Sequence, residues 1–333
     1  RLELRRQNMI PTAALPYKNA LGYTYDCGDF AAGMELAVTL AGLDDYGSRK
    51  AQSLNRGKLR GFALVNAIER AAGPVLEFAE IRFNPSGTAT VLMGTKSQGQ
   101  GHETVFKQIL HEKLGLDLSE VQFIDGDTDK VAFGMGTNGS RSTVIGGSAL
   151  VGAAEKVIAK GRRIAAHLLE ASPDDLTFAN GVYTVAGTDK SMGLKAVARA
   201  AFVPARLPPG VEGGLIETAT FSPRTDTYPN GCHVCEVEVD PETGDVDLVA
   251  YSVVDDVGTV INPLTLKGQI HGGIAQGVGQ ALMEAVTYDA ETGQLLGTSF
   301  MDYAMPRADT FCDLQVESNP VPTSLNPLGA KGA

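Results

Sequence analysis

The apolar and polar positions along the chain alternate in patterns that predict helices and β-hairpins. Apolar residues follow a helical period through Phe30, Met34, Ala37 and Leu40, and Asp29 precedes them as an N-cap. Strand-like alternation occurs in pairs of segments around turns rich in Pro, Asp, Asn and Gly, so each pair predicts a hairpin. The pairs are 76–83 with 88–93, 234–239 with 246–253, and 286–288 with 295–297.

Helical patterns account for much of the remaining chain. The segment 144–169 is rich in alanine and predicts one long helix, in which Gly161 marks a candidate break. The segments 60–68 and 121–124 are interpreted as strands. Because hairpins dominate, we expect mixed or antiparallel sheets with helices packed on them, an α+β fold class. The other helices are predicted at 1–8, 105–114, 194–201 and 263–284.

The length of the chain indicates more than one hydrophobic core. A chain of 333 residues usually forms more than one domain, so two packed sub-domains are expected. The Pro/Gly-rich segment 204–214 is the predicted internal boundary. The predicted division is an N-terminal helical and extended region at 1–72, a first sub-domain at 73–205 and a second sub-domain at 211–333.

Charge and cysteine content narrow the class of protein. Lysine and arginine number 28 against 39 for aspartate and glutamate, a formal net charge of −11. Nucleic-acid binding needs a basic surface, so no nucleic-acid partner is expected, although a local pocket can still bind an anionic cofactor through backbone N–H groups. We recognise no apolar run of membrane-spanning length and no signal peptide, and predict a reduced, cytoplasmic protein. The four cysteines, too few for a disulfide framework, are Cys27, Cys232, Cys235 and Cys312.

A glycine-rich turn lies between the predicted strand ending near Met93 and the helix beginning near Glu103. Its glycines let a ligand approach the backbone, and the helix start offers free N–H groups and the positive end of a dipole. The turn suits a phosphate or a polar heterocycle, and an ordinary strand-to-helix turn is the alternative. Its residues are Gln98, Gly99, Gln100, Gly101 and His102.

A second loop of this kind precedes the long helix. Gly134, Gly136 and Gly139 match G-x-G-x-x-G, but Glu155, the acidic residue at the expected distance, lies inside a helix, so a dinucleotide-binding fold is not indicated. The hydroxyls of the loop suit a phosphate, and a solvated Ser/Gly loop is the alternative. Two such loops favour one extended ligand that contacts both. The candidate contacts are Thr137, Asn138, Gly139, Ser140, Arg141 and Ser142.

The helix predicted at 263–284 is unusually rich in glycine. Each glycine costs about 1 kcal/mol relative to alanine in a helix, so the sequence needs a reason, either close helix packing or close ligand approach. Gln269, Gly273, Gln276 and Gln280 share one face, and buried amides need partners. A polar ligand and tight packing are both compatible with this pattern.

Two patterns that look like metal sites are interpreted otherwise. Asp125–Asp129 begins like a calcium loop, but Lys130 and Gly136 stand where that loop needs Gly and Glu, so a turn is predicted. Cys232 and Cys235 enter an alternating strand and should point to opposite faces, so we predict packing cysteines and no zinc site.

Four stretches together resemble the molybdenum-binding large subunit of the xanthine oxidase and aldehyde oxidase family, nearest to the aerobic carbon monoxide dehydrogenase large chain type. They are 94–104, 136–143, 257–279 and 326–332. The resemblance runs along the whole chain and corresponds to the C-terminal portion of the family's large subunit, so we expect a fragment.

The resemblance implies a molybdopterin cofactor, in the cytosine dinucleotide form usual in bacteria, with molybdenum held through the pterin and by no direct protein ligand. It implies that residues 98–102 contact the pterin and the molybdenum ligands and that residues 137–142 hold pterin and phosphate groups. It also places Gln269 and Gln276 beside the cofactor, and Lys331 and Gly332 in the loop leading to the catalytic base. The sub-domains 73–205 and 211–333 would both bind molybdopterin.

The implied activity is that of an oxidoreductase that hydroxylates carbon monoxide, an aldehyde or an N-heterocycle with water. Electrons would pass to an iron–sulfur small subunit and an FAD medium subunit in a dimer of heterotrimers. The general-base glutamate is expected just beyond Ala333 and the substrate loop upstream of Arg1, so the fragment alone is expected to be inactive and largely free of molybdenum. We expect Gln100 and Gln269 to converge on one cavity. The alternative is a non-catalytic binding module for a nucleotide-like anion.

Overall fold

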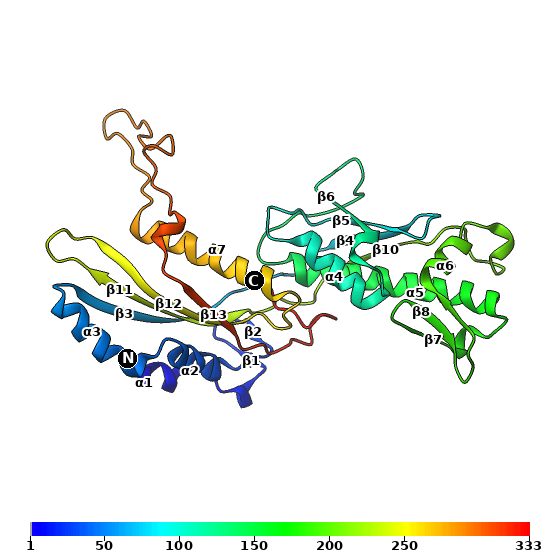
Figure 1. The fold of residues 1–333 in the computed structure, drawn as a ribbon, viewed down its shortest axis with the longest axis horizontal. Coiled ribbons are helices and arrows are strands. Elements are labelled where there is room, and N and C mark those ends of the chain that lie inside the picture. Colours follow the sequence, from blue (N-terminus) through cyan, green and yellow to red (C-terminus); the bar gives the residue numbers. More distant parts are fainter. Residues whose placement is uncertain (1) are drawn as a thin grey trace. The chain divides into compact units, whose positions relative to one another are not determined.

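The computed structural model describes residues 2–333, which form two compact units (Figure 1). Among these, the first unit contains residues 2–69 and 228–321 with Ala333, and the second contains residues 70–227 and 322–332. Each unit is therefore assembled from segments that are far apart in the sequence. The Pro/Gly-rich segment 204–214 connects helix α6 (Leu194–Ala200) to strand β10 (Ile216–Phe221), and both elements belong to the second unit.

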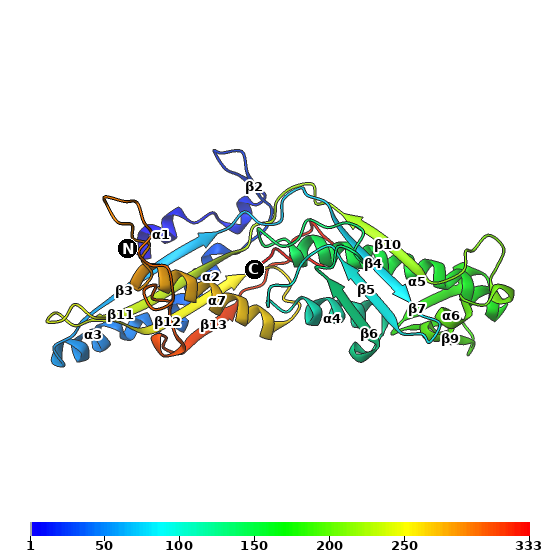
Figure 2. The same cartoon turned by 90° about the horizontal axis from the view of Figure 1, so that it is seen from above.

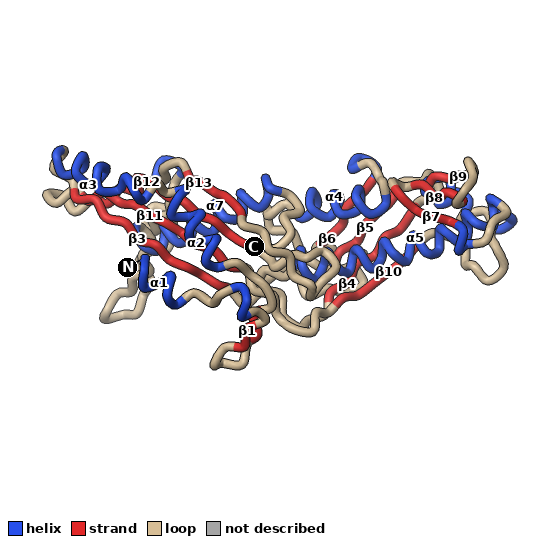
Figure 3. The backbone as a smooth tube through the Cα atoms, turned by 90° about the horizontal axis from the view of Figure 1, so that it is seen from below, coloured by secondary structure: helices blue, strands red, loops and turns tan. Residues whose placement is uncertain are grey.

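The first unit is a four-stranded sheet with helices on both faces. The strand order is β13-β12-β11-β3, with antiparallel pairing except between β12 and β13. Three helices cover one face and α7 covers the other (Figures 1 and 3). The strands are β3 (Leu59–Ile68), β11 (Asn230–Val239), β12 (Val246–Asp256) and β13 (Leu314–Ser318), and the helices are α1 (Leu2–Asn8), α2 (Phe30–Leu40), α3 (Tyr46–Asn55) and α7 (Pro263–Leu282).

The alternation along β11 explains why this sheet has an apolar core on each side. Met34 of α2 packs against Cys232 and Val234, whereas Ile270 and Ile274 of α7 pack on the opposite face. The predicted hairpin at 234–239 and 246–253 is confirmed and is longer than expected, and Asp29 caps α2 as predicted by accepting the Ala32 N–H. The third predicted hairpin forms only one bridge, between Tyr288 and Leu295, in a segment that projects beyond α7 (Figure 1).

Helix α3, which the sequence pattern did not reveal, is attached to the sheet by ion pairs. Two buried carboxylates of β11 meet it: Glu236 pairs with Arg49 at 2.5 Å and with Arg60 of β3 at 2.7 Å, and Glu238 pairs with Arg56 at 2.5 Å. Burial by itself would raise the pKa of Glu236, but hydrogen bonds from the two arginines hold that pKa below its usual value. Helix α3 is therefore attached through charged residues. It lacks the apolar stripe by which most helices are predicted from sequence.

The second unit also has a four-stranded sheet, in the order β10-β4-β5-β6 (Figure 2). The predicted hairpin of β4 and β5 is confirmed, and α4 crosses from β5 to the parallel strand β6. A three-stranded sheet, β7-β8-β9, was not predicted because its strands are only three or four residues long. The elements are β4 (Glu77–Phe83), β5 (Ala89–Met93), α4 (His102–Leu114), β6 (Val121–Asp125), α5 (Gly147–Leu169), β7 (Leu176–Ala179), β8 (Val182–Val185) and β9 (Ser191–Gly193).

The helical segment Ser142–Leu169 is long and apolar enough to span a membrane, by length and composition only. This finding corrects the expectation that the chain has no segment of that length. Inside the second unit, 67% of the apolar window is buried, because α5 packs on β4 and β10. The segment begins with a π-helical turn at Ser142–Gly146 and continues as α5.

Gly161 does not break α5, which is continuous from Gly147 to Leu169. The glycine instead allows a neighbouring residue to pack closely against the helix. A Cβ atom at this position would lie 2.2 Å from the hydroxyl oxygen of Tyr183, a fully buried residue of β8. That hydroxyl donates to the Ile158 carbonyl at 3.1 Å. The three-stranded sheet therefore approaches α5 closely at Gly161, where the helix has no side chain.

We predict that Gly161→Ala lowers the free energy of unfolding by roughly 1–3 kcal/mol, because overpacking at Tyr183 outweighs the better helix propensity of alanine. The measurement is chemical denaturation. Gly47→Ala in α3 is the matched control, since a Cβ there meets no atom within 4 Å. The packing explanation is wrong if both variants gain stability.

Candidate functional site

The two loops identified in the sequence lie side by side in the second unit. The first loop, Gln98–His102, follows β5 and leads into α4, and the second loop, Thr137–Ser142, leads into the π-helical turn before α5. The Lys96 N–H donates to the Thr137 hydroxyl oxygen at 3.2 Å and so links the two loops. Residues that are about 40 positions apart in the sequence thus form one surface at the beginning of two helices.

Hydroxyl groups and left-handed backbone shape the second loop. The hydroxyls of Thr137 and Ser142 are hydrogen-bonded at 2.9 Å, and the Gly139 carbonyl accepts the Ala72 N–H at 2.9 Å. Gly139 and Ser140 have φ values of 55° and 52°, a conformation that is costly for serine. The loop is therefore held by contacts at both ends.

A buried ion pair lies beneath the second loop. Arg141 and Glu77 are 2% and 0% exposed, and the guanidinium donates to the carboxylate at 2.7 Å. The other carboxylate oxygen accepts the Phe78 N–H at 3.1 Å and the Met135 N–H at 3.4 Å. Burial raises the pKa of Glu77, and the two N–H donors and Arg141 oppose that rise. Arg141, predicted as a phosphate contact, is instead directed into the protein.

The backbone close to this ion pair leaves no room for side chains. A Cβ atom on Gly94 would lie 2.0 Å from the Glu77 carboxylate, and one on Gly134 would lie 2.2 Å from the Gly94 carbonyl oxygen. The Gly136 N–H donates to that same carbonyl at 3.2 Å. Two glycines therefore allow the strand end and the second loop to pack backbone to backbone.

The side-chain amide of Gln100 forms its hydrogen bonds close to the first loop itself. The Gln98 N–H donates to the side-chain oxygen of Gln100 at 2.5 Å, and the Gln100 side-chain NH₂ donates to the Lys96 carbonyl at 3.4 Å. Gly99 and Gly101 have φ values of 102° and 87°, which only glycine adopts readily. Gln100 is thus folded back on its own loop, the local bonding expected of a structural role, and a ligand would have to compete with it.

His102, the first residue of α4, is buried without a hydrogen-bond partner. Its side chain is 6% exposed, and neither ring nitrogen has a partner among the described residues. The same is true of the hydroxyl of Thr95, which is fully buried. Burial lowers the pKa of His102, and the nearby Asp125 carboxylate raises it by a smaller amount. His102 is therefore neutral near pH 7.

The C-terminal loop, residues 322–332 of the second unit, also contacts the second loop. The Asn326 side chain organises it by donating to the Ala330 carbonyl at 2.7 Å, and the carbonyl of the fully buried Lys331 accepts the Thr227 hydroxyl at 2.7 Å. Gly332 has a φ of 105°, and a Cβ there would lie 2.5 Å from the Ser140 carbonyl oxygen. Three predicted segments of the second unit are therefore contiguous.

Gln269 and Gln276 belong to the first unit, on the exposed face of α7. A Cβ atom added to the neighbouring Gly272 or Gly273 would meet no atom within 4 Å, so packing in this unit does not require glycine there. Because Gln100 belongs to the other unit, the convergence of Gln100 with Gln269 stays a prediction.

The turn and the packing cysteines predicted for the two metal-like patterns are present in the structure. β6 ends at Asp125 and the chain turns at once. Cys232 and Cys235 lie on β11, and burial raises their pKa values to about 12 and about 11, so the thiols are protonated and unreactive near pH 7. Across residues 2–333, no group of three His, Cys, Asp or Glu side chains is arranged to bind a metal ion.

Sequence reasoning missed the residues that support the loops from below. Glu77 is an acidic residue at the start of an apolar strand, and such a charge at a core position is a usable signal. The sequence pattern indicates only a turn at Asp125, although its carboxylate accepts the Ser97 N–H at 2.6 Å. Thr95 carries no signal in the sequence.

Comparison with known proteins identifies the class of ligand. A family model described as the molybdopterin cofactor-binding domain matches residues 39–312. The chain is 36% identical to the carbon monoxide dehydrogenase large chain of Hydrogenophaga pseudoflava, over 99% of this chain and 43% of that protein. It therefore spans less than half the length of the curated relative.

Solved structures show the same fold. The chain matches quinoline 2-oxidoreductase from Pseudomonas putida 86 with a TM-score of 0.92 and 35% identity, covering 99% of this chain and 44% of that one. It matches the Cu,Mo-containing carbon monoxide dehydrogenase with a TM-score of 0.91 and 34% identity, covering 99% and 43%. The expected α+β architecture is confirmed.

We predict that Glu77→Gln lowers the free energy of unfolding by about 3 kcal/mol, because it leaves the Arg141 charge buried and unpaired. Hydrogen exchange at the Met135 amide should also accelerate. Glu103→Gln is the control, since its ion pair with Lys107 is exposed at the glutamate and worth only about 0.5 kcal/mol. Equal effects of the two substitutions would contradict a special role for the buried pair.

Proposed function

The chain belongs to the molybdopterin cofactor-binding domain family, and on that premise we propose that its first loop, second loop and C-terminal loop together bind the pterin and phosphate groups of molybdopterin. The single observation that carries the proposal is the contact between these segments, through Lys96 with Thr137 and through Gly332 with Ser140. Ligands that are long and polar are the ones that need several adjoining loops.

The residues present fit such a ligand. The glycines of the first loop expose backbone N–H groups at the start of α4, and the positive end of the helix dipole favours an anion there. The hydroxyls of Thr137, Ser140 and Ser142 offer further donors at the start of the second helix. The unpartnered polar atoms of His102 and Thr95 lie next to the first loop. The two loops therefore offer many hydrogen-bond donors and carry few bulky side chains.

The proposal gives each segment a role. Gln98 to His102 would hold the pterin end, and the second-loop hydroxyls would hold phosphate groups, while Arg141 would support that loop from beneath. Gln269 and Gln276 would add amide donors from α7. When bound, molybdopterin supplies the molybdenum redox chemistry of a hydroxylase. The protein's own contribution is to bind, orient and exclude water from that group.

The proposal extends to the complete protein. We infer an oxidoreductase that hydroxylates its substrate with water, using the cytosine dinucleotide form of the cofactor, in the cytoplasm. An iron–sulfur small subunit and an FAD medium subunit would accept the electrons, in a dimer of heterotrimers. Residues 73–205 and 211–333, the two proposed molybdopterin-binding sub-domains, would both contribute contacts, although residues 211–333 are divided between the two units. Relatives named for carbon monoxide and for quinoline leave the substrate class open.

The alternative of a non-catalytic module for another nucleotide-like anion has no support from these relatives. Carbon monoxide dehydrogenase and quinoline 2-oxidoreductase are both named as redox enzymes. The family match also names molybdopterin itself as the cofactor. Binding of molybdopterin is therefore the property to test first.

We predict that Gly273→Ala weakens molybdopterin binding by about tenfold while raising the free energy of unfolding by up to about 1 kcal/mol. The added methyl group meets nothing within its own unit but would obstruct a ligand lying on α7. Binding is measured by titrating the purified chain with molybdopterin and following pterin fluorescence.

Gly47→Ala provides the matched control, because it adds a methyl group to an equally open position of α3, away from the proposed site. It should gain similar stability and bind molybdopterin like the unaltered chain. If Gly273→Ala binds normally, α7 does not contact the ligand. If the unaltered chain does not bind molybdopterin at all, the proposed site is wrong.

A further inference from the structure

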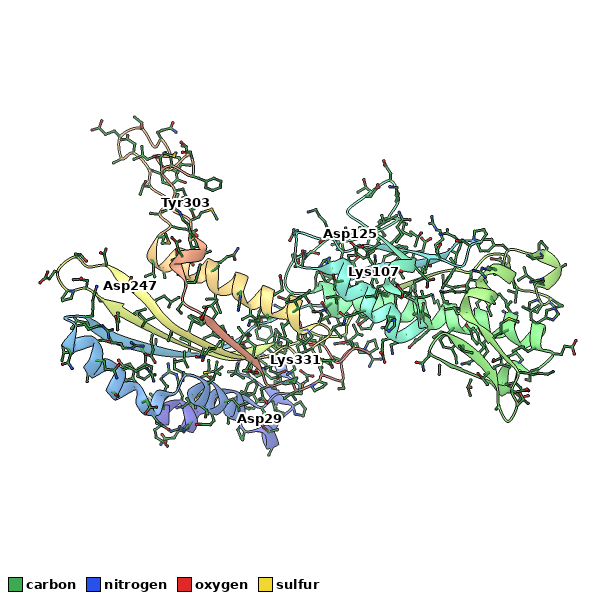
Figure 4. The ribbon with its side chains drawn as sticks, in the orientation of Figure 1. Asp29, Lys107, Asp125, Asp247, Tyr303 and Lys331 are labelled. Carbon is green, nitrogen blue, oxygen red and sulfur yellow. The ribbon has the colours of Figure 1, made fainter. Side chains whose placement is uncertain are left out.

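Asp125 contacts both ends of the first loop. It is the last residue of β6, and its position near α4 is seen in Figure 4. One carboxylate oxygen accepts the N–H of Ser97, the residue before the loop, at 2.6 Å. The same oxygen lies 3.8 Å from the Nδ1 atom of His102, the last residue of the loop. A single carboxylate therefore spans five residues of backbone.

The two contacts differ in kind. The Ser97 interaction is a short, charge-assisted hydrogen bond of the sort that is roughly twice as strong as a neutral one. The His102 distance is too long for a hydrogen bond, so the carboxylate acts on the ring only through its electrostatic field. Water screens that field little because the two side chains are only 6% and 15% exposed.

Of the groups that contact the His102 ring, Asp125 is the one that can interact with it through charge. The other face of the imidazole meets Phe106, with ring centroids 5.4 Å apart, which offers no hydrogen-bond acceptor. Asp125 is the one charged group that opposes the effect of burial on the pKa of His102. The nearer ring nitrogen, Nδ1, lies 3.8 Å from the carboxylate, so the negative charge there favours the tautomer with its proton on Nδ1.

We propose that Asp125 is a positioning residue for the ligand of the first loop: it fixes the backbone at Ser97 and the tautomer of His102, and so holds Gln98 to Gly101 in the conformation that binds. This inference rests on the proposed function, because it concerns the same loop. It goes further by naming the residue that sets the geometry of that loop.

The neighbouring acidic residues do not share this role. Asp127 pairs with Lys130 at 2.8 Å and accepts the Asp129 N–H at 3.1 Å, so it stabilises only its own turn. The Asp129 side chain is exposed. Asp129→Asn is thus a matched control that removes one negative charge from the same turn without touching the loop.

The experiment uses Asp125→Asn, Asp125→Ala and Asp129→Asn in the full chain. In the ligand-free state, NMR titration of the His102 ring should show a lower pKa in Asp125→Asn than in the unaltered chain, because the carboxylate raises that pKa. Asp129→Asn should leave it unchanged. The ¹⁵N shifts of the ring should also report loss of the Nδ1–H tautomer as the major form.

Titration with molybdopterin, followed by pterin fluorescence, supplies the second readout. Asp125→Ala should bind about tenfold more weakly, because the Ser97 N–H loses its acceptor. Asp125→Asn should recover part of the affinity, since its amide oxygen can still accept that bond. Asp129→Asn should bind like the unaltered chain. A merely destabilised fold would not change the His102 tautomer.

The outcomes separate the two proposals. Normal binding by Asp125→Ala, or an unchanged His102 pKa in Asp125→Asn, overturns the positioning role while the unaltered chain still binds molybdopterin. Failure of the unaltered chain to bind overturns the proposed function and, with it, the ligand part of this inference. The expected result is a His102 pKa shift and a graded loss of affinity confined to the Asp125 variants.

Discussion

The buried ion pair between Glu77 and Arg141 is the interaction on which the second unit's site depends. The Glu77 carboxylate accepts hydrogen bonds from the Phe78 N–H at the start of β4, from the Met135 N–H and from the Arg141 guanidinium. A carboxylate taken out of water in this way is tolerated when its oxygens are bonded, and both oxygens of Glu77 accept hydrogen bonds. Gly94 must be glycine because the Glu77 carboxylate occupies the space of a side chain there, and Gly134 because it packs against the backbone of Gly94.

That constraint creates a surface of a particular chemistry. With Arg141 directed inward, the second loop presents hydroxyls and backbone N–H groups, beside a first loop that Asp125 and Gln100 hold. These are neutral donors backed by two helix starts, so the surface can accept an anion although the whole chain is acidic. Binding then depends on the shape of the loops more than on net charge.

Two helices show that helical glycines can have opposite explanations. Gly161 of α5 is required by a neighbour in its own unit, the Tyr183 hydroxyl. Gly272 and Gly273 of α7 meet no such neighbour, while the opposite face of the helix buries Ile270 and Ile274 against the sheet. Glycine on an exposed helix face costs stability, and no contact within the first unit requires it at these two positions.

The sequence alone determined two of the three predicted hairpins, most of the helices and the two loops, because periodicity and turn chemistry are local properties that tertiary packing rarely reverses. It also determined the family, through motifs that are specific in combination. Only the tertiary structure decided that Arg141 is directed inward, that Gly161 sits against Tyr183 and that Asp125 reaches the first loop. Each of these facts joins residues far apart in the chain or facing one another across packed elements, and the pairing of a buried charge leaves no periodic trace in the sequence.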